Sequence, residues 1–341
     1  MTKTTIRQIA KELGISPATV SKAISGKPEV NEQTRARVLA RVRELGYVSP
    51  NGSIRQGALR VAVLIKDYLR DNAEGGIPYR DHNIFHYDII MGLKEYGEKK
   101  NMEIIMLTTT DEAQANSSYD DFMQSKNIDG AFIYGLRTQD PYFLQLKDTA
   151  IPTVILEHSV NNPQVGRVGI DNVAGAELAV EHLISLGHRS IGLLNGHPQT
   201  HAARERFAGY AAALSRYDIP FRRELVLEGD STIQRGQEGA DYFTNMKITA
   251  LFCASDFLAM GAIKGFRDKG IRIPGNISIV GFDNLPFTNL YSPRLTTVAQ
   301  DRRQIGLCAG ALLLLIMEGE PIRHCVLTPF LIERETTTAL L

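Results

Sequence analysis

The feature that most constrains this chain is a pair of short helical segments near the amino terminus, joined by only three residues, 14–16. Thr5 suits the N-cap of the first segment, and Gly14 stands where a left-handed C-terminal cap is wanted. Ser16 suits the next N-cap, and Pro17 follows at the first helical position, where its missing N–H is no loss. A link this short predicts a sharp corner between two helices.

A third helix is predicted between Asn31, another favourable N-cap, and Gly46. Each of the three segments carries an apolar stripe at helical spacing. The stripes are Ile6, Ile9, Ala10 and Leu13, then Val20, Ala23 and Ile24, then Val38, Leu39, Val42 and Leu45. Helix, tight turn with glycine, helix and a packing helix is the pattern of the DNA-binding helix-turn-helix.

The second helix leaves a short, mostly uncharged face outside, as a helix that enters the major groove must have. We expect Lys22 to reach a guanine edge or a phosphate, and Pro17 and Ala18 to touch thymine methyl groups. Four hydroxyl side chains are candidate phosphate contacts. They are Ser16, Thr19, Ser21 and Thr34. A small three-helix scaffold that binds a partner other than DNA is the alternative interpretation.

The charge distribution favours a nucleic-acid partner. Residues 1–60 hold 11 Lys and Arg against 4 Asp and Glu, whereas the whole chain of 341 residues has 38 of each. The basic excess at the amino-terminal end is therefore matched by an equal acidic excess over residues 61–341. Such asymmetry is typical of a DNA-binding end attached to a body with another task.

Several protein classes are disfavoured by what the sequence lacks. No apolar run is long enough to span a membrane, and no apolar leader segment follows Met1, so we expect a cytoplasmic protein. The three cysteines, at 253, 308 and 325, form no CxxC pair, which argues against a zinc finger or a redox pair.

Motifs for catalysis and metal binding are also missing. The sequence contains no GxxxxGK[ST] loop, GxGxxG turn after the first strand, HExxH or GxSxG, so we predict no catalytic residues and no cofactor. His82 and His86 have helical spacing but no evident third ligand, and a proline lies between His197 and His201. We therefore predict no metal site.

From residue 61 onward, apolar runs alternate with helical periodicity. Residues 61–65 form a continuous apolar run, as expected of a strand buried on both faces. The alternation occurs in two blocks, the second starting at Val168, which predicts two parallel-sheet α/β subdomains. Helices are expected near 87–100, 113–125, 172–186, 203–216, 257–269 and 300–317, and strands near 103–107, 130–134, 153–156, 168–170, 190–194, 250–254, 278–282 and 326–333.

Three stretches, 5–10, 14–21 and 34–47, together resemble the headpiece of the LacI/GalR family of bacterial transcription regulators, and the resemblance extends over almost the whole chain. It implies a three-helix headpiece followed by a body like the periplasmic binding proteins, made of two parallel-sheet α/β subdomains. The implied boundaries are 1–51 for the headpiece, 52–60 for a hinge, 61–341 for the effector-binding and dimerisation body, about 61–160 plus 295–325 for subdomain 1, and about 161–292 plus 326–341 for subdomain 2. Crossings between subdomains are expected near 159–166, 291–297 and 323–328.

The hinge departs from the family pattern. Similar proteins fold this segment on DNA and insert a leucine into the minor groove, but the corresponding residue here is Gly57. Glycine also disfavours a helix, by about 1 kcal/mol relative to alanine. Leu59 replaces the leucine only if the helix is shifted, and a plain flexible linker is the alternative.

The resemblance also implies functional residues, on the positions that match the family's motifs. Thr5, Tyr47 and Asn51 join the expected DNA contacts. In the body, Asp283 and Arg206 are the strongest candidates for contacting an effector between the two sheets. The other candidates are Phe85, His86, Glu157, Asp171, Phe252 and Ser255. The function implied is an operator-binding homodimer, a repressor of sugar or related catabolic genes, that responds to a small molecule, with a sugar or sugar phosphate favoured.

Two further points stay open in the sequence. The segment 66–83 is longer and more charged than a usual strand-to-helix loop, and either a lid or a dimer contact would explain it. A cytosolic sugar-processing enzyme or sensor with an appended helix-turn-helix is the alternative function.

Overall fold

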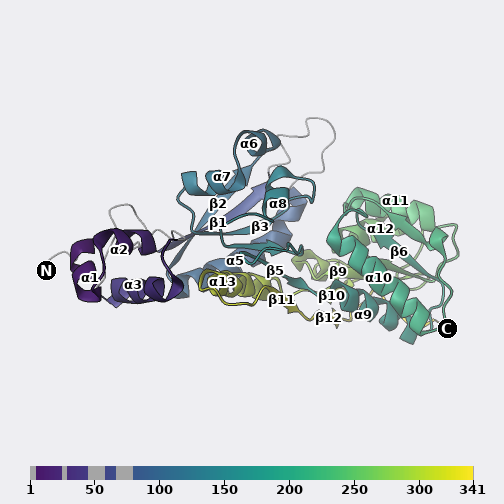
Figure 1. The fold of residues 1–341 in the computed structure, drawn as a ribbon. Helices are drawn as coiled ribbons and strands as arrows, with labels where there is room; N and C mark the ends of the chain where they lie inside the picture. The colour runs from purple at the N-terminus through teal and green to yellow at the C-terminus, as the bar shows by residue number, and fades with distance from the viewer. Residues whose placement is uncertain (1–4, 25–28, 45–57, 67–79, 341) are drawn as a thin grey trace. The chain divides into compact units, whose positions relative to one another are not determined.

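The computed structural model describes residues 5–24, 29–44, 58–66 and 80–340 of the chain (Figure 1). The chain divides into two compact units, Met1–Leu59 and Arg60–Leu341. Two of the expected DNA contacts, Tyr47 and Asn51, lie outside the described residues, as do Gly57 and most of the 66–83 segment.

The amino-terminal unit contains the three expected helices, α1 (Ile6–Leu13), α2 (Pro17–Ile24) and α3 (Glu32–Glu44). Thr5 caps α1 through its side chain, and Gly14 ends it with a left-handed φ of 68°. The hydroxyl of Ser16 accepts a hydrogen bond from the backbone N–H of Thr19 at 3.0 Å, as expected of an N-cap. The core of the unit is formed by Ile9, Ala10, Val20, Ala23, Val30, Val38 and Val42.

The second unit is built on two sheets, each with six described strands. In the first sheet the order is β11-β5-β4-β3-β1-β2, and the neighbours from β11 to β1 are parallel. Its strands are β1 (Leu59–Lys66), β2 (Met102–Thr109), β3 (Gly130–Tyr134), β4 (Thr153–Leu156), β5 (Val165–Ile170) and β11 (His324–Leu327).

The second sheet has the order β12-β10-β9-β8-β6-β7. Only the pair formed by β10 and β12 is antiparallel; the other described pairs run parallel. Its strands are β6 (Ile191–Asn195), β7 (Val226–Glu228), β8 (Ala250–Cys253), β9 (Ser278–Asp283), β10 (Thr296–Ala299) and β12 (Phe330–Ile332). The expected class, two parallel-sheet α/β subdomains behind a helical headpiece, is confirmed.

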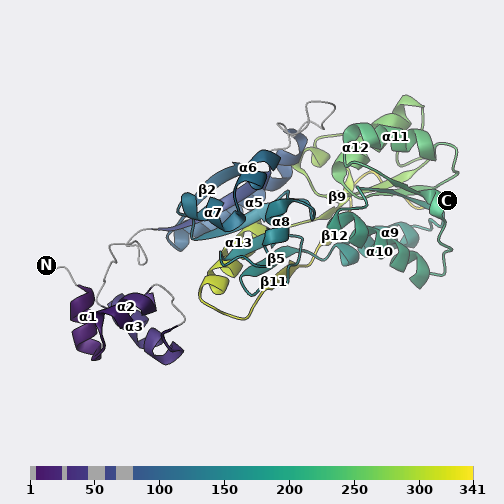
Figure 2. The same ribbon diagram turned by 45° about the horizontal axis from the view of Figure 1, so that its top comes forward.

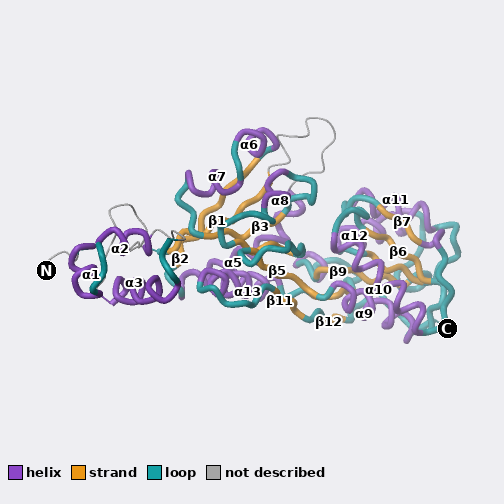
Figure 3. Tube along the Cα trace, in the orientation of Figure 1, coloured by secondary structure: helices purple, strands orange, loops and turns teal. Residues whose placement is uncertain are grey.

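Helices cover both faces of each sheet, as Figures 2 and 3 show. We call each sheet with its helices a lobe. The first lobe contains α5 (Arg80–Lys99), α6 (Asp111–Asn116), α7 (Tyr119–Ser125), α8 (Pro141–Gln145) and α13 (Arg302–Met317). The second contains α9 (Asn172–Ser185), α10 (His201–Arg216), α11 (Ile233–Phe243), α12 (Asp256–Asp268) and the short turns η1 (Arg223–Leu225) and η2 (Pro286–Asn289).

Two helices of the first lobe, α5 and α13, touch along glycines. A Cβ added to Gly306 would lie 1.9 Å from the carbonyl oxygen of Ile89, and one added to Gly92 would lie 2.0 Å from that of Arg303. Only glycine allows the two backbones to approach this closely. The two helices are therefore packed in backbone contact.

The positions at which the chain crosses between lobes differ from the expectation at two of three places. The strand at 165–170 belongs to the first sheet, so the chain leaves that lobe after Ile170 rather than within 159–166. The strand at 296–299 belongs to the second sheet, so the return lies near Gln300 rather than within 291–297. The third crossing, between β11 and β12, lies at the end of its expected range.

Three expected elements also need correction. The helix predicted over 113–125 is two helices, because Ser118 begins a new one with its own cap. The strand predicted over 326–333 is two short strands that belong to different sheets. Leu59 is the first residue of β1, so in this structure it is not part of a hinge helix that would carry a minor-groove wedge.

Candidate functional site

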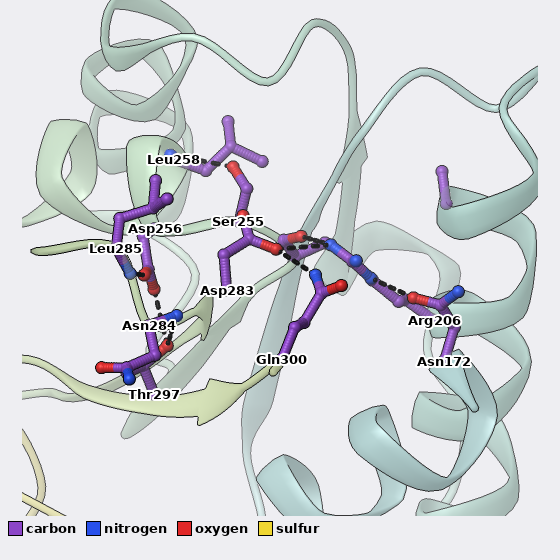
Figure 4. A network of polar contacts seen from close by, with 12 residues as sticks. Asn172, Arg206, Ser255, Asp256, Leu258, Asp283, Asn284, Leu285, Thr297 and Gln300 are labelled. Atoms are coloured by element: carbon purple, nitrogen blue, oxygen red, sulfur yellow. Dashed lines mark hydrogen bonds and ion pairs between the residues drawn. The ribbon is translucent and has the colours of Figure 1, made fainter. Parts of the chain in front are cut away.

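Arg206 and Asp283 meet between the second sheet and α10, as Figure 4 shows. The guanidinium Nη1 lies 3.7 Å from Oδ1 of Asp283, and both side chains are at least nine-tenths buried. Nε of Arg206 donates to Oδ1 of Asn172 at 2.8 Å, and Nη1 donates to the carbonyl of Ala254 at 2.5 Å. The guanidinium carbon lies 3.7 Å from the centre of the Phe282 ring, a cation–π contact that holds the fork flat.

Asp283 is held in an unusual backbone conformation at the end of β9. Its φ is 116° and that of Asn284 is 52°, both in the region that L-residues rarely adopt. Gln300 donates from Nε2 to Oδ1 of Asp283 at 2.6 Å. Burial raises the pKa of the Asp283 carboxyl, and the Arg206 charge works in the opposite direction. Strain of this kind is typical of binding sites, where surrounding contacts maintain it.

Arg302 fixes the backbone of this strained turn from the first residue of α13. Its Nη1 donates to the carbonyl of Asp283 at 2.5 Å and to that of Asn284 at 3.3 Å. Nη2 of the same guanidinium pairs with Asp88 of α5 at 2.9 Å. One side chain therefore links the end of β9 in the second lobe to the α5–α13 pair in the first.

A second buried carboxylate, Asp256, has a structural environment. Its Oδ2 accepts from the backbone N–H of Leu285 at 2.7 Å, and its Oδ1 accepts from the hydroxyl of Thr297 at 2.6 Å (Figure 4). Burial and the neighbouring Asp283 raise its pKa. Both oxygens are used within the protein, so Asp256 holds the turn after β9 rather than facing a ligand.

Glu157 follows β4 of the first sheet and lies against residues of the second lobe. Asn172 donates from Nδ2 to Oε2 of Glu157 at 2.7 Å and to Oε2 of Glu205 at 3.2 Å. Nδ1 of His201 lies 3.2 Å from the same oxygen of Glu205. Burial raises the pKa of the Glu157 carboxyl and lowers that of the His201 imidazole. We call Glu157, His201 and Glu205 the inter-lobe triad.

The other expected effector contacts have mixed placements. Phe85 and His86 lie on α5, where His86 stacks on Tyr134 with ring centres 4.1 Å apart. Asp171 caps α9, and its Oδ1 accepts from the backbone N–H of Ala174 at 2.9 Å. Phe85 and His86 are partly buried, and Asp171 is exposed.

Two expected contacts are used inside the second lobe. Phe252 is 0% exposed and packs on Phe282, so the structure places it in the core rather than beside a ligand. Ser255 caps α12 through a 3.2 Å bond from the backbone N–H of Leu258. The physical reason is local: the end of β8 turns directly into α12, which uses the serine as a cap.

The structure adds residues that the sequence analysis missed. They are Asn172, Glu205, Gln300 and Arg302, together with His201 as a neighbour of two carboxylates. The spacing His201-x-x-x-Glu205 on one helix was an available signal. Gln300 and Arg302 follow β10, which the sequence analysis assigns to subdomain 1 but which belongs to the second sheet. Their proximity to Asp283 could therefore not be predicted.

In the headpiece, the outward face of α2 has the expected composition. Ser16, Pro17, Ala18, Ser21 and Lys22 are exposed, and Thr5 lies on the surface as well. The hydroxyls of Ser16 and Thr19 are 2.8 Å apart, and Thr34 donates its N–H to the Asn31 side chain at 2.8 Å. Nζ of Lys22 lies 2.6 Å from Oε2 of Glu29, with both side chains more than half exposed.

Comparison with known proteins finds a match for the headpiece and another for the body. Residues 5–51 match the model of the bacterial regulatory proteins of the lacI family, and residues 180–337 match the periplasmic binding protein-like domain. The HTH-type transcriptional repressor PurR of Photobacterium profundum is 29% identical over 313 residues, which cover 91% of this chain and 91% of PurR.

Two solved structures resemble the full chain. The transcriptional regulator CelR–cellobiose complex has a TM-score of 0.72 at 25% identity, and the match covers 98% of this chain and 100% of that one. The lac repressor dimer bound to operator and the anti-inducer ONPF has a TM-score of 0.69 at 25% identity, with 99% and 100% covered.

A helix-turn-helix headpiece joined to a periplasmic-binding-protein-like body defines a DNA-binding regulator of transcription. Its headpiece matches the LacI family of bacterial regulatory proteins, and almost the whole chain is similar to regulators such as PurR. Within the described residues, every helix is too short or too polar to cross a membrane.

Proposed function

We propose that this regulator is a homodimeric repressor of genes for sugar or related catabolism, and that a hydroxyl-rich small molecule bound at Asp283 and Arg206 controls it. The observation that carries the proposal is the buried pair of Arg206 on α10 with Asp283 at the carboxyl end of β9, the edge of an open α/β sheet where ligands bind. The CelR neighbour is a complex with cellobiose, which supports a sugar.

The charges around Asp283 favour a neutral ligand over a phosphorylated one. Arg206 pairs with Asp283, Arg302 with Asp88, and Arg167 lies 3.6 Å from Glu205. An incoming phosphate would have to displace a carboxylate from one of these arginines. A sugar hydroxyl instead donates to a carboxylate and accepts from a guanidinium without disturbing the balance.

DNA binding is proposed for the outward face of α2 with Lys22, and for Thr5, Ser16, Thr19 and Thr34 around it. Tyr47 and Asn51 are proposed as further contacts by resemblance. A two-fold dimer carries two headpieces, so the operator is proposed to be a pseudo-palindrome read in the cytoplasm. The headpiece, hinge and body are proposed at 1–51, 52–60 and 61–341.

The proposed control is a change in the relation of the two lobes when the ligand binds. The ligand acts only through its different affinity for the two states, typically about 1–3 kcal/mol of coupling. We propose no catalytic turnover, in keeping with relatives that are regulators.

The test begins with duplexes selected by the purified full chain from random DNA at low salt. A library of sugars and sugar phosphates is then screened by thermal shift, and each hit is measured by calorimetry with product analysis. We expect a two-fold symmetric consensus, and a neutral sugar that changes DNA affinity and is recovered intact. Failure to select any sequence rejects the repressor, and conversion of the sugar supports the enzyme alternative.

A further inference from the structure

The inter-lobe triad brings together three side chains that suit a metal ion. His201 and Glu205 stand one turn apart on α10, and Glu157 reaches them from the end of β4 in the other lobe. Nδ1 of His201 lies 3.2 Å from Oε2 of Glu205 and 4.0 Å from Oε2 of Glu157. One ligand atom from each residue lies within 4.8 Å of the other two.

The hydrogen bonds present do not fully explain this convergence. Nδ1 of His201 is buried and approaches Oε2 of Glu205 at 3.2 Å without the geometry of a hydrogen bond. One amide group, that of Asn172, donates to both carboxylates and carries no charge. Arg167 lies beside the other oxygen of Glu205, Oε1, at 3.6 Å. The charges of Arg206 and Arg167 also act on Glu157. A cation among two carboxylate oxygens and an imidazole nitrogen within 4.8 Å of one another stabilises the group further.

We propose that Glu157, His201 and Glu205 bind one divalent cation of the zinc type. One imidazole and two carboxylates are ligands that Zn²⁺ accepts, and a tetrahedral ion with bonds of about 2.0–2.2 Å places its ligand atoms roughly 3.3–3.6 Å apart. The His201–Glu205 separation of 3.2 Å is close to this spacing, and the His201–Glu157 separation of 4.0 Å must shorten when the ion binds. A neutral imidazole and two carboxylates balance the charge of the ion, and the fourth position is left for water or a ligand hydroxyl.

An ion bound at the inter-lobe triad has ligands from both lobes. Glu157 belongs to the first lobe, and the two α10 ligands belong to the second. A bound cation therefore ties the lobes at the strand ends, close to Asn172 and Arg206. Metal and effector then influence each other's affinity by the same factor, in whichever direction the coupling acts.

The first measurement is calorimetric titration of Zn²⁺ into the tag-free, chelator-treated full chain without DNA or sugar. We expect one ion per chain, and a d–d absorption band when Co²⁺ replaces Zn²⁺. This readout is independent of the proposed function, because metal binding is measured whether or not any DNA or sugar binds.

Three variants locate the ion. Glu205→Gln keeps shape and fold, His201→Ala removes the nitrogen ligand, and His197→Ala removes an exposed histidine four residues before it on the chain. We expect Kd to rise at least about tenfold in the first two, since even residues behind the ligands change affinity by about that much. His197→Ala should bind like the original chain. Unchanged zinc affinity in folded Glu205→Gln, or no binding at millimolar zinc, overturns the proposal.

Discussion

Arg302 of α13 reaches Asp88 of α5 with two nitrogens, Nη2 at 2.9 Å and Nε at 3.1 Å from the same carboxylate oxygen. The third nitrogen of the guanidinium, Nη1, holds the carbonyl of Asp283 in the second lobe. The contact partners of this one side chain therefore include the helix pair of the first lobe and the turn that carries the proposed effector carboxylate.

Replacing Arg302 should weaken communication rather than effector binding itself. Arg302→Met keeps the length of the side chain and removes both sets of bonds. We expect the ratio of DNA affinities with and without effector to fall by about fivefold or more, since typical couplings are 5–150-fold. Fluorescence anisotropy with a selected operator, at zero and saturating effector, measures this ratio.

The neighbouring residue supplies a matched control. The side chain of Arg303 also extends from α13 to α5, where it forms a surface ion pair with Glu95. Arg303→Met removes the same charge from the same helix but touches no residue of the second lobe in its described pairing. An unchanged coupling ratio in Arg302→Met, or an equal loss in both variants, would contradict the assignment of Arg302.

Substitution of the two buried aspartates of the second lobe should have different effects: at Asp283 on effector binding, and at Asp256 on the free energy of unfolding. Asp283→Asn keeps an acceptor for Gln300 and tolerates the positive φ, but it removes the charge beside Arg206. Because hydrogen bonds to charged groups contribute about 1.5–3 kcal/mol, we expect effector Kd to rise about tenfold or more. Operator affinity without effector should stay the same.

Asp256→Asn is the counterpart, since Asp256 accepts bonds from Leu285 and Thr297 with different oxygens. An amide replaces one acceptor and leaves the other contact unmade, which costs about 1–3 kcal/mol of unfolding free energy. Urea unfolding measures that loss, and calorimetry should find effector affinity nearly intact. If Asp256→Asn lost effector binding while Asp283→Asn kept it, the roles given to the two residues would be reversed.

How much of this site could be predicted depended on sequence distance. The caps at Thr5 and Ser16 bond three residues ahead, so local spacing predicts them. Ser255 caps α12 in the same way, but the sequence analysis takes it for an effector contact. The Arg302–Asp88 pair spans 214 positions, and no local pattern indicates it.

The lobe assignments failed for a related reason. A short apolar run such as β5 or β10 predicts a strand but not the sheet it joins, because the partner strand is chosen by packing far along the chain. Phe252 shows the same limit. From the sequence, an aromatic residue near a strand end can either stack on a ligand or pack in the core, and only the structure shows that this one is 0% exposed. Asp283 and Arg206 are proposed as site residues through motif resemblance, and their contact could not be predicted from the sequence.

Lys22 and Glu29 should have opposite effects on DNA binding. The two side chains form an exposed ion pair at 2.6 Å, so Glu29 competes with any phosphate or base that Lys22 approaches. Lys22→Ala should weaken operator binding with the headpiece still folded, and Glu29→Gln should strengthen it by freeing the lysine and removing a negative charge.

Salt dependence distinguishes the type of contact that Lys22 makes. If Lys22 neutralises one phosphate, its removal reduces the slope of log affinity against log salt by about 0.9. If it reads a guanine, the slope stays and the preference at one base pair relaxes. Equal operator affinity for the original chain and Lys22→Ala would remove Lys22 from the DNA-binding face.

The environment of His158 predicts that the stability of the protein falls at acidic pH. It lies next to Glu157, edge-on to the rings of Phe143 and His201 at 5.3 and 5.8 Å. Burial, with a smaller effect of the His201 charge, lowers its pKa to about 4. The unfolded chain, where histidine has a pKa of about 6.5, binds more protons between these values, so His158 makes stability fall as pH drops from about 6.5 towards 4.

His158→Gln should remove that contribution, so its unfolding free energy should decline less steeply on acidification than that of the original chain. Urea unfolding of the chelator-treated proteins at pH 7 and pH 5 gives both slopes. The carboxyls of Glu157 and Asp283, whose raised pKa values act in the opposite direction, are present in both proteins and largely cancel in the difference. The exposed His197, changed to Gln, is the control and should leave the slope unaltered; parallel profiles for His158→Gln and the original chain would show that His158 is equally easy to protonate in both states.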